Sequence, residues 1–252
     1  MQVDVAIEST GVFDTYEKAG AHITAGAKHA VISAPVKEDA LNGATVLMGV
    51  NEDKLSTCSV SSNASCTTNS ASPVIAILDE KIGIEKALLN TTHSYTATQS
   101  IVDGPVKGAD FRRGRAAAQN MAPSSTGAAV AVTKAYEQLK GKFDGISVRV
   151  PTPAGSIADI TFVAKRDTTA EEVNNILREA AKEERWKGIF EASEEQLVSS
   201  DIIGNTHASI ADLALTRVVG GNLVKVMAWY DNEMGYAHML LRHIKKAAQL
   251  SK

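Results

Sequence analysis

Short apolar segments of two different kinds restrict the fold of this chain. Over the first fifty residues, apolar runs at 3–7, 29–33 and 44–49 surround an amphipathic segment at 15–27. Strands that alternate with a helix are typical of parallel βαβ units. We therefore expect the front of the chain to form a parallel α/β sheet.

The second half of the sequence has a different pattern. Residues 145–150 and 156–164 alternate apolar and polar side chains, which predicts half-buried strands. Gly220-Gly221-Asn222 separates two β-rich segments and predicts a hairpin. A helix is expected to begin at Thr168-Thr169 and another at about residue 233. The sequence thus predicts an antiparallel α+β part, with residues 104–125 as a structured surface loop.

Composition excludes several classes of protein. The fractions of hydrophobic (44%) and charged (22%) residues are those of an ordinary globular protein. A net charge of −3 favours neither a nucleic-acid-binding nor an anionic-membrane surface. The sequence shows no apolar span, no secretory leader and no pattern of metal ligands. Two cysteines suit a reducing cytoplasm, so we expect a cytoplasmic protein.

Cys66 is the strongest local signal for chemistry. It lies in the polar segment 62–69, just before a predicted helix in which Ser72-Pro73 would form an early turn. Backbone N–H groups at a helix start favour a thiolate and predict a lowered thiol pKa. The alternative is a buried structural cysteine, which fits so polar a setting poorly and describes Cys58 better. His93 is the best candidate base, although spacing alone does not bring it to Cys66.

Several segments together resemble the glyceraldehyde-3-phosphate dehydrogenase family. They are ASCTTN at 64–69, HSYTATQ at 93–99, VDGP at 102–105, RRGRAAAQN at 112–120, PSSTGAA at 123–129, RVPTP at 149–153 and WYDNEMGY at 229–236. Ser70 stands where the family has a second cysteine, which leaves the chemistry of the first untouched. The resemblance covers nearly the whole chain.

The resemblance also implies a division of the chain into three parts. Residues 1–65 would be the C-terminal half of a Rossmann-type NAD(P)-binding domain, and residues 66–231 a catalytic domain with an antiparallel sheet. Residues 232–252 would form a helix that returns to the nucleotide-binding domain.

The activity that this family implies is the phosphorylating oxidation of glyceraldehyde 3-phosphate to 1,3-bisphosphoglycerate, a step of glycolysis. Cys66 would attack the aldehyde, with His93 lowering its pKa and acting as general base and acid. The Cys66 N–H and His93 would hold the oxyanion. Oxidation by the nicotinamide would leave a thioester, which inorganic phosphate would then cleave.

The remaining site residues follow from the same resemblance. The site for the substrate's own phosphate would hold Thr96, Thr98 and Arg149, and that for the attacking phosphate Ser65, Thr67, Thr126 and Gly127. Cofactor contacts would come from Thr10, Gly11, Ser33, Asn232 and Tyr236. Taken singly, each Ser or Thr is equally explained as a turn or cap residue. Arg112–Arg115 would line a neighbouring subunit's cofactor pocket in a homotetramer.

The expected cofactor is NAD, with NADP an open alternative. The family's glycine-rich G-x-G-x-x-G turn, which receives the pyrophosphate, does not occur in this sequence. We therefore expect the first strand to be an exposed edge and this chain alone to bind cofactor poorly. Two other functions stay open: an erythrose-4-phosphate dehydrogenase, and an inactive chain that serves only in assembly.

Overall fold

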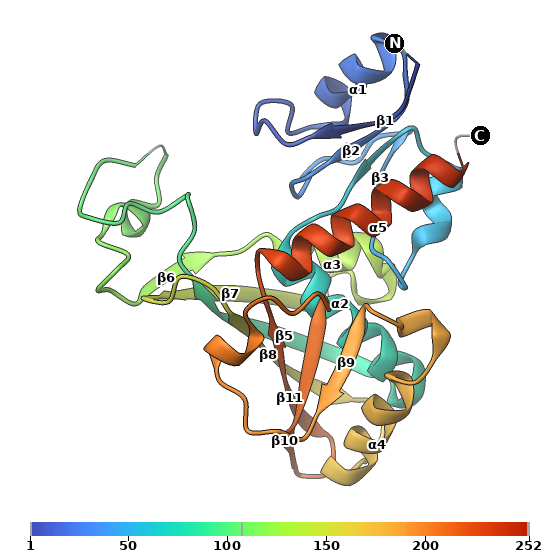
Figure 1. The fold of residues 1–252 in the computed structure, drawn as a ribbon. Helices are drawn as coiled ribbons and strands as arrows, with labels where there is room; N and C mark the ends of the chain where they lie inside the picture. Colours follow the sequence, from blue (N-terminus) through green and yellow to red (C-terminus); the bar gives the residue numbers. More distant parts are fainter. Residues whose placement is uncertain (1, 107, 251–252) are drawn as a thin grey trace.

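Two β-sheets and the helices between them make up the architecture, which is α/β plus α+β (Figure 1). The computed structural model describes residues 2–106 and 108–250. The first sheet has the order β1-β2-β4-β3, and all its pairings are parallel. Its strands are β1 (Val3–Glu8), β2 (Ala27–Ile32), β3 (Gly43–Thr45) and β4 (Val60–Ser62). The predicted parallel sheet is confirmed.

Helices cover both faces of this first sheet (Figure 1). Helix α1 (Tyr16–Thr24) begins at Thr15, whose hydroxyl accepts the Lys18 N–H, and packs on one face through Tyr16. Helix α5 (Met234–Leu250) lies against the other face. As expected, β1 is an edge strand, and its Ile7 is 50% exposed.

Strand β3 is shorter than the predicted segment 44–49. It ends at Thr45 because the Asn51 side chain bonds the backbone on both sides of the strand end. The Asn51 amide donates to the Thr45 carbonyl at 2.9 Å and accepts the Leu47 N–H at 2.8 Å. Backbone groups that a side chain satisfies do not need a neighbouring strand.

The second sheet has seven strands in the order β6-β7-β5-β8-β11-β10-β9. Its pairings are antiparallel except β5–β7 and β9–β10, which are parallel. The strands are β5 (Ile84–Ser94), β6 (Ala122–Ser125), β7 (Phe143–Val150), β8 (Ser156–Ala164), β9 (Phe190–Ser193), β10 (Ser209–Val219) and β11 (Leu223–Tyr230). The predicted hairpin is present, with Gly220 and Gly221 both at positive φ. Strand β6 is a difference, because it pairs with β7 at the end of what the sequence predicts as loop.

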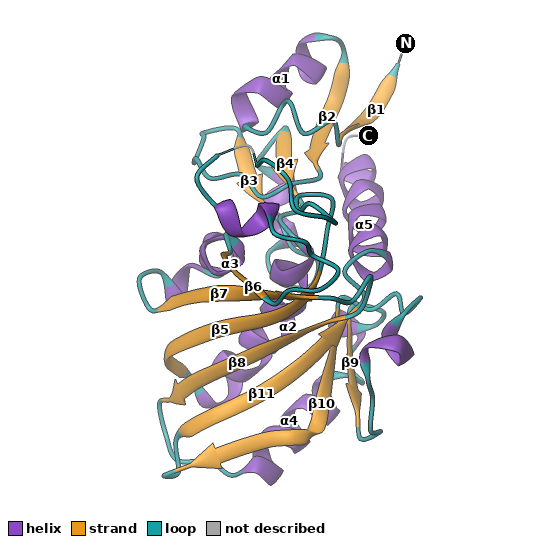
Figure 2. Cartoon of the chain, turned by 90° about the vertical axis from the view of Figure 1, so that its left-hand side faces the viewer, coloured by secondary structure: helices purple, strands orange, loops and turns teal. Residues whose placement is uncertain are grey.

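Helices lie on one side of the seven-stranded sheet and leave its other side open (Figure 2). They are α2 (Cys66–Ile82), α3 (Ala128–Ala135) and α4 (Ala170–Ala180). Short 3-10 helices are η1 (Glu52–Ser56), η2 (Phe111–Gly114), η3 (Glu137–Leu139), η4 (Glu184–Trp186) and η5 (Ser199–Ile202). None of the helices described is long and apolar enough to cross a membrane.

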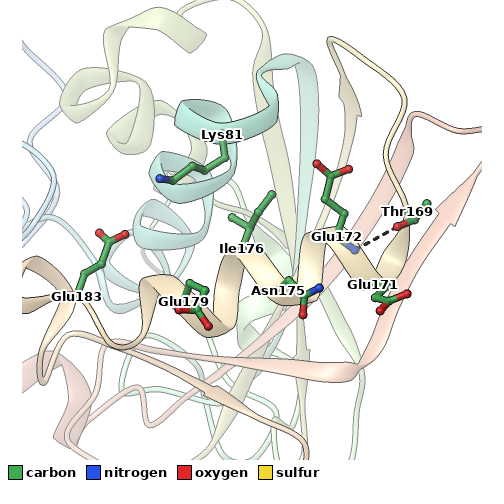
Figure 3. A pocket seen from close by; sticks show the side chains of 8 residues that line it. All are labelled: Lys81, Thr169, Glu171, Glu172, Asn175, Ile176, Glu179 and Glu183. Carbon is green, nitrogen blue, oxygen red and sulfur yellow. Dashed lines mark hydrogen bonds between the residues drawn. The ribbon is translucent and has the colours of Figure 1, made fainter.

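The starts of α2 and α4 test two predictions from sequence. Helix α4 begins where expected, with the Thr169 hydroxyl accepting the Glu172 N–H at 3.1 Å (Figure 3). Helix α2 begins seven residues before Pro73, which therefore lies inside the helix and not in an early turn as predicted. Proline in a helix interior lacks the N–H for the ladder. The cap at Ser65, whose hydroxyl accepts the Thr68 N–H at 3.1 Å, sets the earlier start.

Candidate active site

Cys66 is the first residue of α2, at the junction between the two sheets. The turn before it includes Ala64, which has φ 55°, a conformation uncommon for a residue with a side chain. The Asn69 side-chain amide donates to the carbonyls of Asn63 and Ser65, both at 2.9 Å, and so ties this turn to the helix. The turn and the helix cap together fix the direction of the Cys66 side chain.

His93 meets Cys66, with its Nε2 at 3.3 Å from the Cys66 Sγ. It lies near the end of β5, where inward-facing residues of the strand are buried. Its Nδ1 is 2.7 Å from the Ser94 carbonyl, which only accepts, and this contact favours a hydrogen on Nδ1. Arg149 Nη1, 2.9 Å from the same Nδ1, only donates and favours the other tautomer, but it has a second acceptor in the Ser94 carbonyl at 3.2 Å. With the hydrogen on Nδ1, the Nε2 is free to accept the thiol proton.

Burial acts on both members of this pair. It raises the pKa of the Cys66 thiol, while the Thr67 backbone N–H and the Arg149 charge act in the opposite direction. Burial also lowers the pKa of His93 to about 4, helped by the charge of Arg149. The prediction of a lowered thiol pKa is therefore wrong for this structure, because desolvation outweighs the helix start. The resting pair is a thiol beside a neutral imidazole.

A cluster of cationic and hydroxyl side chains borders the Cys66–His93 pair. Arg149, on β7, is half-buried, and its Nε has no hydrogen-bond partner among the described residues. Thr96 and Thr98 follow β5, with their hydroxyls 3.0 Å apart. Arg113 donates to the Thr98 hydroxyl at 2.8 Å, and its charge lowers the pKa of both His93 and Arg149. Forked guanidinium donors beside hydroxyls suit a phosphate group.

Arg113 is the site residue that the sequence reasoning missed. The resemblance assigns its segment to a neighbouring subunit's pocket, whereas the structure brings Arg113 to this chain's own Thr98. It is held in place by the Ser124 hydroxyl at 2.8 Å and the Asp110 carboxylate at 3.2 Å. The run of arginines at 112–115 was the available signal, but only the fold shows which of them turns inward.

The residues predicted for the attacking phosphate are divided between two helix starts. Ser65 is the N-cap of α2, and Thr67 follows Cys66, with its hydroxyl 2.9 Å from that of Tyr230. Gly127 is the N-cap of α3, and the Thr126 hydroxyl accepts the Ala128 N–H at 3.1 Å. Within the described chain, no hydrogen bond joins Thr126 or Gly127 to Cys66 or His93. Helix capping and turn formation therefore explain part of the set of residues predicted for the attacking phosphate.

Three of the residues predicted for the cofactor lie at the carboxyl ends of parallel strands, where open α/β sheets bind ligands. Thr10 and Gly11 follow β1, and Ser33 follows β2, with its hydroxyl 3.1 Å from that of Tyr236. Asn232 is buried, and its side-chain oxygen accepts from the Ser94 hydroxyl at 2.7 Å. The structure brings Ser33, Tyr236 and Asn232 to the end of α2 that bears Cys66. Tyr236 hydrogen-bonds the Ala64 carbonyl, and Asn232 hydrogen-bonds the Ser94 hydroxyl.

A cavity elsewhere carries no comparable chemistry. It lies between the last turn of α2, at Lys81, and helix α4 (Figure 3). Lys81 is fifteen residues along α2 from Cys66, so about 22 Å separate them at 1.5 Å per residue. Over the described residues, no group of three or more His, Cys, Asp or Glu side chains could hold a metal ion.

Comparison with known proteins identifies the family. Residues 65–232 match the model of the glyceraldehyde 3-phosphate dehydrogenase C-terminal domain. The chain is 48% identical to glyceraldehyde-3-phosphate dehydrogenase of Zymomonas mobilis, over 99% of this chain and 72% of that protein. It is 47% identical to glyceraldehyde-3-phosphate dehydrogenase 1 of Bacillus subtilis, with the same coverage of both. The chain belongs to the glyceraldehyde-3-phosphate dehydrogenase family.

Proposed function

We propose that this protein catalyses the phosphorylating oxidation of glyceraldehyde 3-phosphate to 1,3-bisphosphoglycerate, with NAD or NADP as the oxidant. The observation that carries the proposal is the 3.3 Å contact between Cys66 Sγ and His93 Nε2 beside the cationic side chains of Arg149 and Arg113. This arrangement places a nucleophile and a base next to an anion site. The relatives of the chain are named for the same substrate.

The first step uses the resting thiol–imidazole pair. As the Cys66 sulfur forms a bond with the aldehyde carbon, the thiol proton passes to His93 Nε2. The carbonyl π electrons move to oxygen, and that oxyanion lies between the Cys66 N–H and the new Nε2–H. His93 can take this proton because its Nδ1–H remains bonded to the Ser94 carbonyl.

The residues present fit a nicotinamide cofactor on one side of this centre. Asn232 has its side-chain oxygen held by Ser94, Ser156 and Gly155, so the orientation of the amide is fixed before any ligand arrives. Tyr236 and Ser33 would flank the cofactor, and Thr10 and Gly11 would meet it at the carboxyl edge of the sheet. Bound NAD or NADP would supply the oxidation that converts the hemithioacetal into a thioester.

Two anion sites complete the reaction. Arg149, Thr96 and Thr98 would hold the phosphate of the aldehyde, with Arg113 as an added donor. Ser65, Thr67, Thr126 and Gly127 would receive inorganic phosphate through hydroxyl and amide donors. A phosphate oxygen then attacks the thioester carbon, the C–S bond breaks, and the Cys66 thiolate leaves.

The chain would follow the three-part division given by its resemblance. Residues 1–65 contribute to cofactor binding, residues 66–231 carry the chemistry, and residues 232–252 return to the first sheet. The sparse, unpaired cysteines suit a reducing compartment, and we place the protein in the cytoplasm.

The proposal includes a homotetramer built on the open side of the seven-stranded sheet. Apolar side chains gather there without cover in this chain: Leu88, Ile146, Val219 and Leu223 are 42–64% exposed. Alternate residues of a strand point to the same side of a sheet. The register across β8 and β11 aligns Leu88 with a β11 residue two positions from Leu223, so Leu88 and Leu223 point to the same side. A contiguous apolar face of this kind marks a protein–protein contact.

The test is turnover by the purified chain, with NAD raised to concentrations that offset the weak cofactor binding expected of it. The proposal predicts that the absorbance of reduced nicotinamide increases only when glyceraldehyde 3-phosphate, inorganic phosphate and NAD are all present. Cys66→Ser abolishes it, and Cys58→Ser is the matched control that retains it. Turnover that persists in Cys66→Ser would contradict the proposal, and faster turnover of erythrose 4-phosphate would change the substrate.

A further inference from the structure

A buried row of polar side chains connects the first sheet to the turn that precedes Cys66. His29 on β2 has its Nε2 2.8 Å from the Ser61 hydroxyl on β4. The same hydroxyl is 2.7 Å from His243 Nε2 on α5, and His243 Nδ1 is 3.1 Å from the Asn63 side-chain oxygen. All four residues are at most 4% exposed. Buried polar groups of this kind are stable only when hydrogen-bonded, so each contact constrains the others.

With the Asn63 side-chain oxygen facing His243, as in the structure, the hydrogen atoms in this row all point the same way. The Asn63 oxygen only accepts, so His243 Nδ1 must carry a hydrogen. Burial lowers the pKa of His243 to about 3 and also lowers the pKa of His29, so both rings are neutral near pH 7. His243 Nε2 therefore accepts the Ser61 O–H, and the Ser61 oxygen accepts His29 Nε2–H. The row runs from His29 through Ser61 and His243 to Asn63.

Asn63 is the point where this row reaches the catalytic turn. Its backbone N–H donates to the Ile32 carbonyl at 3.0 Å, and its carbonyl accepts the Asn69 amide at 2.9 Å. Ala64, the next residue, has the left-handed φ of 55° and needs its neighbours to hold it there. Helix α5 also reaches Ala64, because the Tyr236 hydroxyl donates to its carbonyl at 3.3 Å.

We propose that His243 is a positioning residue that acts through Asn63 to hold the turn carrying Cys66. The inference rests on the proposed function, since it assigns to α5 the control of where the nucleophilic sulfur lies. His243 touches neither Cys66 nor His93. Loss of its Nδ1–H contact would release the Asn63 side chain, weaken the support of the strained turn, and lengthen the Sγ–Nε2 contact that the first step requires.

Three substitutions distinguish the contributions of the two ring nitrogens of His243. In His243→Asn the side-chain amide nitrogen takes the place of Nδ1 and can still donate to Asn63. In His243→Gln the amide takes the place of Nε2 and reaches Ser61 only. His243→Leu removes both contacts. His29→Leu is the control at the far end of the row, because it leaves the contact between His243 and Asn63 in place.

The readouts are the iodoacetamide alkylation rate of Cys66 in a Cys58→Ser background, kcat, KM and the thermal midpoint. His243→Leu and His243→Gln should slow both alkylation and kcat about tenfold or more, as small misplacements of a reacting group do. KM for the aldehyde should stay the same. His243→Asn should recover both rates, and His29→Leu should lower the thermal midpoint without slowing Cys66.

Two results would overturn the inference. One is an unchanged Cys66 rate in His243→Leu with only a lower thermal midpoint, which would make His243 merely structural. The other is equal rates in His243→Asn and His243→Gln, and this comparison decides alone if His243→Leu does not fold. A wild-type Cys66 that reacts no faster than Cys58 would instead overturn the proposed function, and the inference with it.

Discussion

At the scale of single residues, Arg149 has two effects on one centre. Its charge lowers the pKa of the Cys66 thiol, and the same charge would attract the phosphate of the substrate. Arg149→Gln should therefore slow Cys66 alkylation at fixed pH, because the thiol pKa rises when the positive charge is lost. It should also lower kcat/KM by about 10- to 100-fold, the worth of a hydrogen bond to a charged group.

Alkylation kinetics and steady-state kinetics measure these two effects. The matched control is Arg166→Gln, which removes an exposed arginine that pairs with Glu172 away from the site. Equal losses in Arg149→Gln and Arg166→Gln would contradict a specific role for Arg149.

At the scale of elements, the cap of α2 matters for chemistry as well as stability. Ser65 and Thr169 cap α2 and α4 with the same contact, each hydroxyl accepting a backbone N–H at 3.1 Å. Ser65→Ala and Thr169→Ala should each lower the free energy of unfolding by about 1 kcal/mol, measured by urea denaturation. Only Ser65→Ala should slow Cys66 alkylation, because only α2 carries the nucleophile. Slow alkylation in Thr169→Ala would show that a general loss of stability explains the slower reaction of Cys66.

At the scale of the whole molecule, buried neutral histidines make stability depend on pH. The pKa of His93 is lowered to about 4 and that of His243 to about 3, and that of His29 is also lowered, against about 6.5 in an unfolded chain. The unfolded state therefore binds more protons below pH 6.5, and stability falls as the pH decreases from there toward pH 4. Between these lowered values and pH 6.5, His93 and His243 each contribute a slope of up to about 1.4 kcal/mol per pH unit.

Urea denaturation at pH 7, 6 and 5 measures this slope. His243→Asn should reduce this slope by the contribution of one histidine, since the asparagine does not titrate. A free energy of unfolding that is constant between pH 7 and pH 5 would show that these rings are not neutral and buried as the structure has them.

The assembly is also a property of the whole molecule. Light scattering should give a mass several times the 26.6 kDa of one chain. Leu88→Asp and Ile146→Asp should reduce that mass, because a buried charge opposes association on an apolar face. Leu41→Asp, at a fully exposed site away from that face, is the control that should leave the mass unchanged. A monomeric wild-type chain would contradict the tetramer.

Local patterns in the sequence determined much about this protein. The alternation of strands and helix at 3–49, the period of two at 145–164 and the Gly220-Gly221 turn specified most elements, because neighbouring residues decide strand, helix and turn. The strings around Cys66, His93 and Asn232 pointed to the family, and the matches with known proteins confirm it. Predictions failed where one side-chain contact decided, as at Asn51, which ends β3 by bonding backbone groups four and six residues before it.

Only the tertiary structure determined which groups are in contact and how far each is shielded from solvent. Cys66 and His93 are 27 residues apart, and their contact depends on α2 and β5 packing together. Burial then raised the thiol pKa against the helix-start effect, which no local pattern shows. Arg113 turned inward while Arg115 stayed exposed, and His243 reached Asn63 across 180 residues. Desolvation and long-range contact are properties of the packed chain, so the sequence identified the reacting groups and the fold set their protonation and their neighbours.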